Sequence, residues 1–275
     1  MSTVAAPAPL PKWKFDARYA APLLITTILL IGQIKYSILE SYPQTLLAIG
    51  CSILTEVILG YWIVGKCPHL ASAYVSGISV GILIRSPLFW PLAMCAILTI
   101  ASKYVLRYKG RHLWNPSNFG ISAMLLLAPA VVSGLTQQWG NEFAPLLVIW
   151  LLGAFIVWRL KRLHICVAYL VSFAAFAALR SAFHPAGQDF SNAFWTEIAP
   201  ITGPVYQLFT FFMITDPKST VHGYKAQCLV AFLIAAAECV LRFFHNIHAP
   251  YFALFLVGPI AILVEIARTR QAKKV

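Results

Sequence analysis

The sequence predicts an all-α protein with several membrane-spanning helices, and three observations support this fold class. Of the 275 residues, 60% are hydrophobic and only 11% are charged, which is more apolar surface than a soluble domain of this size can bury. The apolar residues gather in long runs, several of which reach the roughly 18 residues that a membrane-spanning helix needs. The basic residues lie mainly in alternate connections between these runs.

Ten apolar runs cover nearly the whole chain, and each is expected to form one transmembrane segment. They lie near 20–38, 42–64, 70–85, 88–106, 117–134, 144–160, 163–183, 197–215, 223–243 and 249–268. We therefore expect one membrane domain over 18–270, preceded by a disordered cytoplasmic tail at 1–17 and followed by a basic cytoplasmic tail at 271–275. No cleavage site follows the first run, so a signal peptide is not predicted.

The distribution of basic residues predicts the orientation of the chain. If the N-terminus is cytoplasmic, four of the 21 lysines and arginines fall at outer ends of segments, and the other 17 fall on the cytoplasmic side. The four are Lys35, Arg85, Arg180 and Arg242. By the positive-inside rule, ten segments with both termini in the cytoplasm are favoured. The lipid bilayer then explains the net charge of +12 without a nucleic-acid partner.

Two halves of the chain, 18–135 and 143–270, resemble each other. The VLRY stretch at 105–108 matches VLRF at 240–243, and Asn115-Pro116 is echoed by Ala249-Pro250. Because each half contains five segments, an odd number, the second must be inverted relative to the first. Lys103 and Glu238 occupy matching positions, and the inversion places them at opposite membrane faces, so no salt bridge between them is expected. Chance similarity between apolar helices is the alternative.

The third and eighth segments are interrupted. The third contains Ser76-Gly77, and the eighth is broken at Thr202-Gly203-Pro204 before it stops at Asp216-Pro217. Pro204 suits the first position of a helix, with Thr202 or Gly203 as its cap. Only about 18 Å of helix can follow before Thr215, which is less than a bilayer core of about 30 Å. Broken helices at matching places in inverted halves are typical of a binding site, whereas the alternative is a packing kink.

Two carboxylates lie within apolar segments, where ionisable groups indicate function by default. Glu238 has Arg242 one helical turn away and can pair with it. Glu56 has no basic residue within a turn, so it is the sharper candidate for a proton or ligand contact. Asp189 and Glu197 are expected on a solvated outer loop.

Other kinds of site are weakly supported. The six cysteines form no CxxC pair and most are expected to be buried as small apolar residues. His245 and His248 have no evident third ligand, so no metal site is predicted. Neither a nucleophile elbow nor a phosphate-binding loop occurs, which weighs against a hydrolase or a kinase.

Two motifs resemble a known family. The stretch Arg111–Gly120, RHLWNPSNFG, resembles the RHxxNPxxFG signature of the RnfD/NqrB family, and Phe211–Pro217, FFMITDP, resembles its FFxxTDP stretch. That family comprises membrane subunits of ion-translocating, flavin-dependent redox complexes. The resemblance covers about 20–270 and implies the same ten-segment plan in the bacterial inner membrane. The run His248–Phe255 is most similar to UnbU-type proteins encoded with enediyne polyketide biosynthesis genes.

The resemblance implies a flavin cofactor, FMN or riboflavin. Family members attach FMN to a threonine whose position here is occupied by Tyr206, within Gly203–Tyr206 (GPVY), so the flavin is expected to bind non-covalently. Trp114 and Phe119 would be able to stack on its ring, beside a helix start capped by Asn115. The expected cofactor-binding residues are Ser76, Gly77, Trp114, Asn115, Asn118, Phe119, Thr202, Gly203, Tyr206 and Asp216.

The function implied is electron transfer across the membrane, together with other membrane redox subunits or a second copy of the chain. One alternative is a small-molecule transporter or channel, or a protein that binds a hydrophobic polyketide intermediate. The other is a membrane subunit with a purely structural role.

Overall fold

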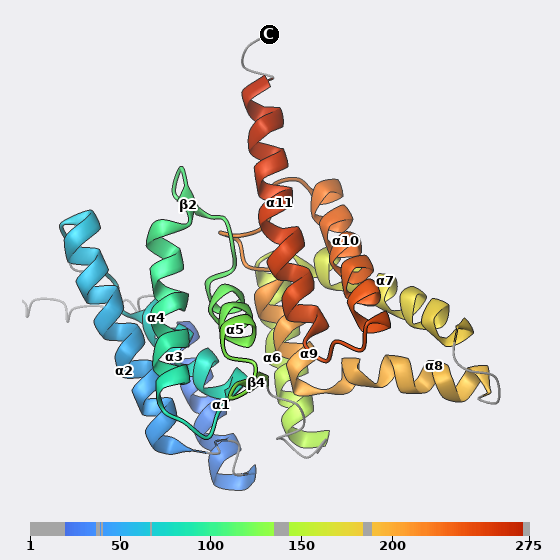
Figure 1. Cartoon of the computed structure of the whole chain (residues 1–275), viewed down its shortest axis with the longest axis horizontal. Coiled ribbons are helices and arrows are strands. Elements are labelled where there is room, and N and C mark those ends of the chain that lie inside the picture. Colours follow the sequence, from blue (N-terminus) through green and yellow to red (C-terminus); the bar gives the residue numbers. More distant parts are fainter. Residues whose placement is uncertain are drawn as a thin grey trace, which may run out of the picture.

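The computed structural model describes residues 20–36, 39, 41–66, 68–134, 143–183 and 189–271, and within them helices dominate (Figure 1). The expected tail at 1–17 lies outside the described residues, as does the expected tail at 271–275 except for Gln271.

Among its described residues, the first half of the chain forms five α-helices, one π-helical extension and four two-residue strands. The helices are α1 (Ala20–Tyr36), α2 (Tyr42–Leu59) with its π-helical extension η2 (Gly60–Val64), α3 (Ala71–Leu83), α4 (Trp90–Val105) and α5 (Pro116–Leu127). Strand β1 (Ile84–Arg85) pairs antiparallel with β4 (Ser133–Gly134), and β2 (Arg107–Tyr108) pairs antiparallel with β3 (Arg111–His112). The second pair forms a hairpin between α4 and α5.

Among its described residues, the second half has helices as its only regular elements, joined by turns. Its elements are α6 (Phe143–Arg159), α7 (Leu163–Ala182), α8 (Phe190–Ile198), the 3-10 turn η3 (Ala199–Thr202), α9 (Pro204–Leu208) with its π-helical extension η4 (Phe209–Met213), α10 (Tyr224–Phe243) and α11 (Ala249–Gln271). Each of the ten apolar runs therefore contains helix.

Helix α8 differs from the expected outer loop. Asp189 stands at its N-cap position, and Phe190 stacks on Phe194 one turn later, with ring centroids 6.4 Å apart. Apolar residues four apart share one helix face. Contact between the two phenylalanines on that face favours a helix over a loop in this segment.

Four helices are long and apolar enough to cross a membrane, among the residues described. They are Tyr42–Val64, Leu163–Ala182, Tyr224–Phe243 and Ala249–Gln271. Shorter apolar helices accompany them at Ala71–Leu83, Trp90–Val105, Pro116–Leu127 and Leu147–Arg159. Large apolar side chains point outwards, such as Ile34 and Trp62, which are 82% and 87% exposed. An outer surface of this kind suits contact with lipid.

Both predicted helix starts are confirmed. Asn115 caps α5, its side-chain oxygen accepting a hydrogen bond from the Asn118 N–H at 3.0 Å, and Pro116 is the first helical residue. Gly203, rather than Thr202, holds the cap position of α9, with extended backbone before Pro204. The third segment is short as expected, because α3 has only 13 residues. The interruption expected at Ser76-Gly77 is wrong, since α3 is continuous through both residues.

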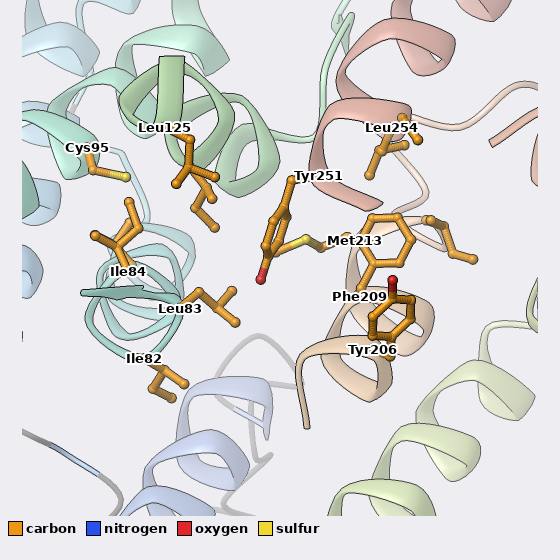
Figure 2. Close-up of a cluster of buried hydrophobic side chains, with 14 of the residues drawn as sticks. Ile82, Leu83, Ile84, Cys95, Leu125, Tyr206, Phe209, Met213, Tyr251 and Leu254 are labelled. Atoms are coloured by element: carbon orange, nitrogen blue, oxygen red, sulfur yellow. The ribbon is translucent and has the colours of Figure 1, made fainter. Parts of the chain in front are cut away.

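Related helix pairs pack in both halves. Helix α2 packs on α4 and α4 on α5, while α7 packs on α10 and α10 on α11. Helices α5 and α11 run in opposite directions, since α5 descends from the β2–β3 hairpin in Figure 1 and α11 rises to the C-terminus. Between the halves, Tyr206, Phe209 and Met213 pack near Tyr251 and Leu254 of α11 in a core that continues to the end of α3 (Figure 2).

Candidate functional site

The first cavity lies where α2, α3, α4 and the start of α5 meet the turn after η4, and is called here the Glu56 cavity. Its volume is about 850 Å³. Glu56, Ser76, Asn115 and Asp216, all expected site residues, line it. A volume of this size is within the ~300–1,000 Å³ that is common for small-molecule sites.

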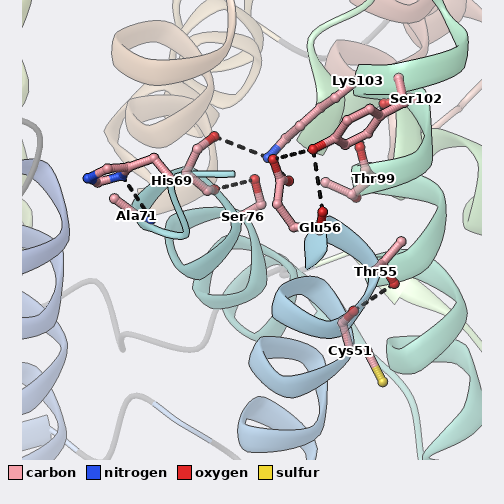
Figure 3. Close-up of polar contacts among 11 residues, drawn as sticks. Cys51, Thr55, Glu56, His69, Ala71, Ser76, Thr99, Ser102 and Lys103 are labelled. Atoms are coloured by element: carbon pink, nitrogen blue, oxygen red, sulfur yellow. Dashed lines mark hydrogen bonds and ion pairs between the residues drawn. The ribbon is translucent and has the colours of Figure 1, made fainter. Parts of the chain in front are cut away.

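A buried ion pair stands at the wall of the Glu56 cavity (Figure 3). The Lys103 ammonium lies 3.4 Å from the Glu56 carboxylate and donates a hydrogen bond to Ser72 Oγ at 3.1 Å. The Tyr104 hydroxyl donates to the other Glu56 oxygen at 3.0 Å. Glu56, which has no basic neighbour in its own segment, thus finds its partner 47 residues later, and that pairing was missed in the sequence.

Two further expected site residues at the Glu56 cavity, Ser76 and Asp216, form local hydrogen bonds. Ser76 Oγ donates to the Ser72 carbonyl within α3. Asp216 accepts hydrogen bonds from the Lys218 N–H and, at 2.6 Å, from Ser219 Oγ, which closes the turn after the broken helix. Burial lowers the pKa of His112, so its imidazole is neutral at pH 7.

The second cavity lies at the broken helix and is called the helix-break cavity. Its volume is about 620 Å³, and its lining includes Thr202, Gly203 and Tyr206 from the break. Arg242 at the end of α10 and His248 in the following loop complete it. Burial lowers the pKa of His248, so this side chain offers a neutral imidazole to the cavity.

A network of buried polar groups forms the floor of the helix-break cavity. Glu238 is fully buried and accepts hydrogen bonds from the Tyr169 hydroxyl at 2.6 Å, from the Tyr206 hydroxyl, and from Arg242 Nε at 3.0 Å. Arg242 Nη2 also donates to the Tyr206 hydroxyl. The expected Glu238–Arg242 pair is therefore present, and two tyrosines that sequence reasoning did not connect to it complete the network.

Glu197 does not stand on a solvated rim, in contrast to the expectation. Its carboxylate accepts a hydrogen bond from Arg180 Nε at 2.6 Å and lies 3.7 Å from Arg242 Nη1. At 3.7 Å the second contact is an ion pair without a hydrogen bond, and Nη1 donates no hydrogen bond among the described residues. Arg242 is 19% exposed and lines the helix-break cavity, while its charge is paired with Glu238 and Glu197.

The other expected site residues pack α5 against its neighbours. Trp114 and Phe119 lie edge to face with centroids 5.7 Å apart, and Phe119 stacks on Phe255 at 5.7 Å. Trp114 Nε1 donates to the Phe255 carbonyl at 2.9 Å, and the buried Asn118 amide donates to the Tyr251 carbonyl at 3.1 Å. These rings therefore contact one another and line neither cavity.

Gly77 allows close helix contact. A Cβ atom there would lie 2.6 Å from the Cα of Ile49 in α2, which is shorter than real contacts. The backbone of α3 thus approaches α2 because residue 77 lacks a side chain, as small residues allow between membrane helices.

The two cavities use corresponding elements. Each is formed by the start of a short helix, α3 or α9, the end of the next helix, α4 or α10, and the start of the following one, α5 or α11. Lys103 bonds to Glu56 and Glu238 bonds to Arg242, so these two residues belong to separate networks.

Among the described residues, no group of three or more histidines, cysteines, aspartates or glutamates is arranged to hold a metal ion. In comparisons with known proteins, no family model and no curated protein matches this chain.

Proposed function

We propose that this chain is a ten-span inner-membrane protein of RnfD/NqrB-like plan, built from two inverted repeats at 18–135 and 143–270, with both termini in the cytoplasm. The matched helix pairs α2–α4 with α7–α10 and α4–α5 with α10–α11 support this. So do the opposite directions of α5 and α11 (Figure 1), because a repeat of five segments inverts its successor.

The proposed ligand is a flavin, FMN or riboflavin, or a similar conjugated molecule, held non-covalently in the helix-break cavity. The observation that carries this assignment is that Arg242 Nη1, at the wall of a cavity of about 620 Å³, donates no hydrogen bond among the described residues. A guanidinium with an unused N–H suits a phosphate or another oxyanion. Thr202 and His248 add neutral polar groups at the same cavity.

Tyr206 is engaged in a way that favours non-covalent binding. It stands where the family carries its attachment threonine, and its hydroxyl donates to Glu238 and accepts from Arg242. The role of this hydroxyl is then to hold the guanidinium in place. A bound flavin would supply the redox chemistry, while these residues position it and limit its contact with water.

The biological role proposed is electron transfer across the membrane, in a complex with other membrane redox subunits or with a second copy of the chain. The similarity of His248–Phe255 to UnbU-type proteins directs this proposal to enediyne biosynthesis. His248 at the helix-break cavity belongs to that stretch.

The test is flavin binding by the purified full chain in detergent. We expect bound or added flavin to be seen by absorption and by fluorescence quenching on titration, and the mass of the polypeptide to be unchanged after denaturation. Because one charge-assisted hydrogen bond contributes about 1.5–3 kcal/mol, FMN should bind roughly 10- to 100-fold more tightly than riboflavin. Arg242→Lys should reduce this preference, whereas Arg268→Lys, on an exposed turn of α11, should keep it. A sample that neither carries nor takes up flavin refutes the proposal.

Transport of a small molecule is the second candidate. It is favoured by the position of the two cavities near opposite ends of α11: Tyr251 lines the helix-break cavity, whereas Glu265 pairs with Arg111 beside Gly110, a residue of the Glu56 cavity. Tyr251 and Glu265 are 14 positions apart on this helix, which corresponds to about 21 Å. Accumulation of a hydrophobic polyketide intermediate or another small molecule in vesicles without redox input would decide for transport.

A further inference from the structure

A third cavity lies between the β2–β3 hairpin and the C-terminal half of α11, and is called the hairpin cavity. Its volume is about 220 Å³. Tyr108, Lys109 and Arg111 line it from the hairpin, and Ile266 and Arg270 line it from α11. It shares no lining residue with the helix-break cavity, so it is independent of the flavin proposal.

Positive charge exceeds negative charge in the hairpin cavity. Its carboxylate, Glu265, is occupied: one oxygen lies 2.8 Å from Arg111 Nη1, and the other accepts from the His222 N–H at 2.7 Å and lies 2.9 Å from His222 Nδ1. Within the part of the chain that the structure describes, Lys109 and Arg270 form no ion pair. Two cationic side chains are therefore left without a counter-charge.

Tyr108 holds both of these cations at the cavity. Its hydroxyl accepts hydrogen bonds from Arg270 at 2.6 and 3.2 Å, and the guanidinium lies 5.2 Å from the ring centroid. Lys109 Nζ lies 5.6 Å from the same centroid. The hydrogen bond from Arg270 is the main cause of a lowered pKa at Tyr108, as expected where cations gather.

The hairpin turn constrains the backbone at Lys109. Lys109 has φ 48° and Gly110 has φ 79°, so both central residues of this two-residue connection are left-handed. That geometry joins two antiparallel strands tightly. Glycine adopts the left-handed conformation freely, whereas lysine adopts it at a cost in free energy. The hairpin therefore imposes on Lys109 a backbone conformation that an extended loop would not impose.

The other side of the hairpin cavity is apolar and continues into a lipid-facing surface. Ile262 and Ile266 line the cavity, and Ile260, Leu263 and Val264 are exposed on the same helix, by 60%, 52% and 45%. Helix α11 is one of those long and apolar enough to cross a membrane. If α11 spans the bilayer, we expect its basic last turn to lie at the depth of the phosphate groups.

We propose that the hairpin cavity binds the phosphate group of an anionic phospholipid, with Lys109 and Arg270 as its cationic partners and the exposed apolar face of α11 beside the acyl chains. Basic pockets beside membrane helices suit such headgroups because each nearby lysine or arginine contributes about 1 kcal/mol. A free phosphate ion offers the same oxygens without acyl chains. The apolar wall of the cavity favours the lipid.

The experiment uses the full chain purified in a neutral detergent. Native mass spectrometry counts bound lipid, and thermal unfolding is followed while phosphatidylglycerol, phosphatidylcholine or inorganic phosphate is added. We expect phosphatidylglycerol to be retained and to raise the unfolding temperature more than phosphatidylcholine does. Inorganic phosphate should give no comparable shift; an equal shift would overturn the assignment to a lipid.

Variants that remove the same number of charges distinguish binding at the hairpin cavity from general attraction of anionic lipid to basic residues. Lys109→Gln with Arg270→Gln should weaken phosphatidylglycerol binding about 5-fold per residue, which is the ~1 kcal/mol per charge converted to affinity. Lys225→Gln with Arg268→Gln removes two charges at exposed positions that line none of the three cavities and should change binding less than 2-fold. Lys109→Arg with Arg270→Lys should retain binding. Equal losses in the two glutamine pairs would overturn the proposal.

Discussion

The buried Glu56–Lys103 pair gives the sharpest prediction about stability. We expect Lys103→Met to destabilise the protein strongly, because the substitution leaves the Glu56 carboxylate with no cation. Both side chains are only 9% exposed and their charged atoms lie 3.4 Å apart. At an effective dielectric constant of about 20, two unit charges at that distance attract each other by about 5 kcal/mol. Loss of one member of a buried pair costs about 3–5 kcal/mol, so we expect a loss of this size.

The double variant shows whether the two charges depend on each other. Glu56→Gln alone should also destabilise by a few kcal/mol, since it strands the Lys103 ammonium. Glu56→Gln with Lys103→Met removes both charges, and replacement of a whole buried pair is often close to neutral. We therefore expect the double variant to be more stable than either single variant.

Reversible unfolding in mixed detergent micelles, followed by far-ultraviolet circular dichroism, measures the free energy of unfolding of the two single variants and the double variant relative to the unsubstituted protein. Lys225→Met is the control, because Lys225 is exposed and such a change should stay within about 0.5 kcal/mol. If the effects of the two single substitutions simply add in the double variant within about 0.5 kcal/mol, the two charges are not coupled and the reasoning is refuted.

Three further predictions concern packing, buried hydroxyls and pH. Gly77→Ala should destabilise the protein by about 1–3 kcal/mol in the same unfolding assay, since the added Cβ would lie 2.6 Å from the backbone of α2. The control is Gly50→Ala, which has no atom within 4 Å of the added Cβ and should be neutral or stabilising by up to about 1 kcal/mol. Equal effects of the two substitutions would contradict the close helix contact. Tyr206→Phe should lower the free energy of unfolding by about 1–3 kcal/mol, because Glu238 and Arg242 lose a hydrogen-bond partner. Tyr251→Phe should be neutral or stabilising, since the buried Tyr251 hydroxyl has no hydrogen-bond partner among the described residues. The reverse order would be inconsistent with these contacts. Because burial lowers the pKa of His112 in the folded protein, its contribution to stability is fully present above its unfolded pKa of about 6.5. That contribution is lost progressively as the pH falls from there towards the lower pKa of the folded state. The drop in unfolding free energy from about pH 8 to about pH 5 should be smaller in His112→Gln, and an unchanged drop would exclude this histidine as its source.

Local signals in the sequence were sufficient for the helix starts. Asn115 before Pro116 and Gly203 before Pro204 begin helices as expected, because capping and proline geometry depend on neighbours in the chain. The Glu238–Arg242 pair was predictable for the same reason, since residues four apart share one helix face. Helix α8 had a comparable local signal in its apolar spacing, which the polar residues around it obscured.

The partners of the buried charges depended on contacts that no local pattern contains. Glu56 meets Lys103 across 47 residues, and Arg111 meets Glu265 across 154. Trp114 and Phe119 illustrate the reverse case: as exposed interfacial rings they would suit a flat ligand, but packing of α5 against α11 places Phe255 beside them. The distribution of the expected site residues between two cavities follows from the same packing.

The sequence by itself determined that this is a helical protein with an apolar surface, where two of its helices begin, and where the segment before Pro204 is interrupted. These properties follow from hydrophobic run length, from caps and from proline, all of which act within a few residues. Only the tertiary structure decided which buried groups are paired and which basic residues at the hairpin cavity have no counter-charge among the described residues. A buried charge is stabilised by whatever group packing brings within about 4 Å, and that group is chosen by the arrangement of helices rather than by distance along the chain.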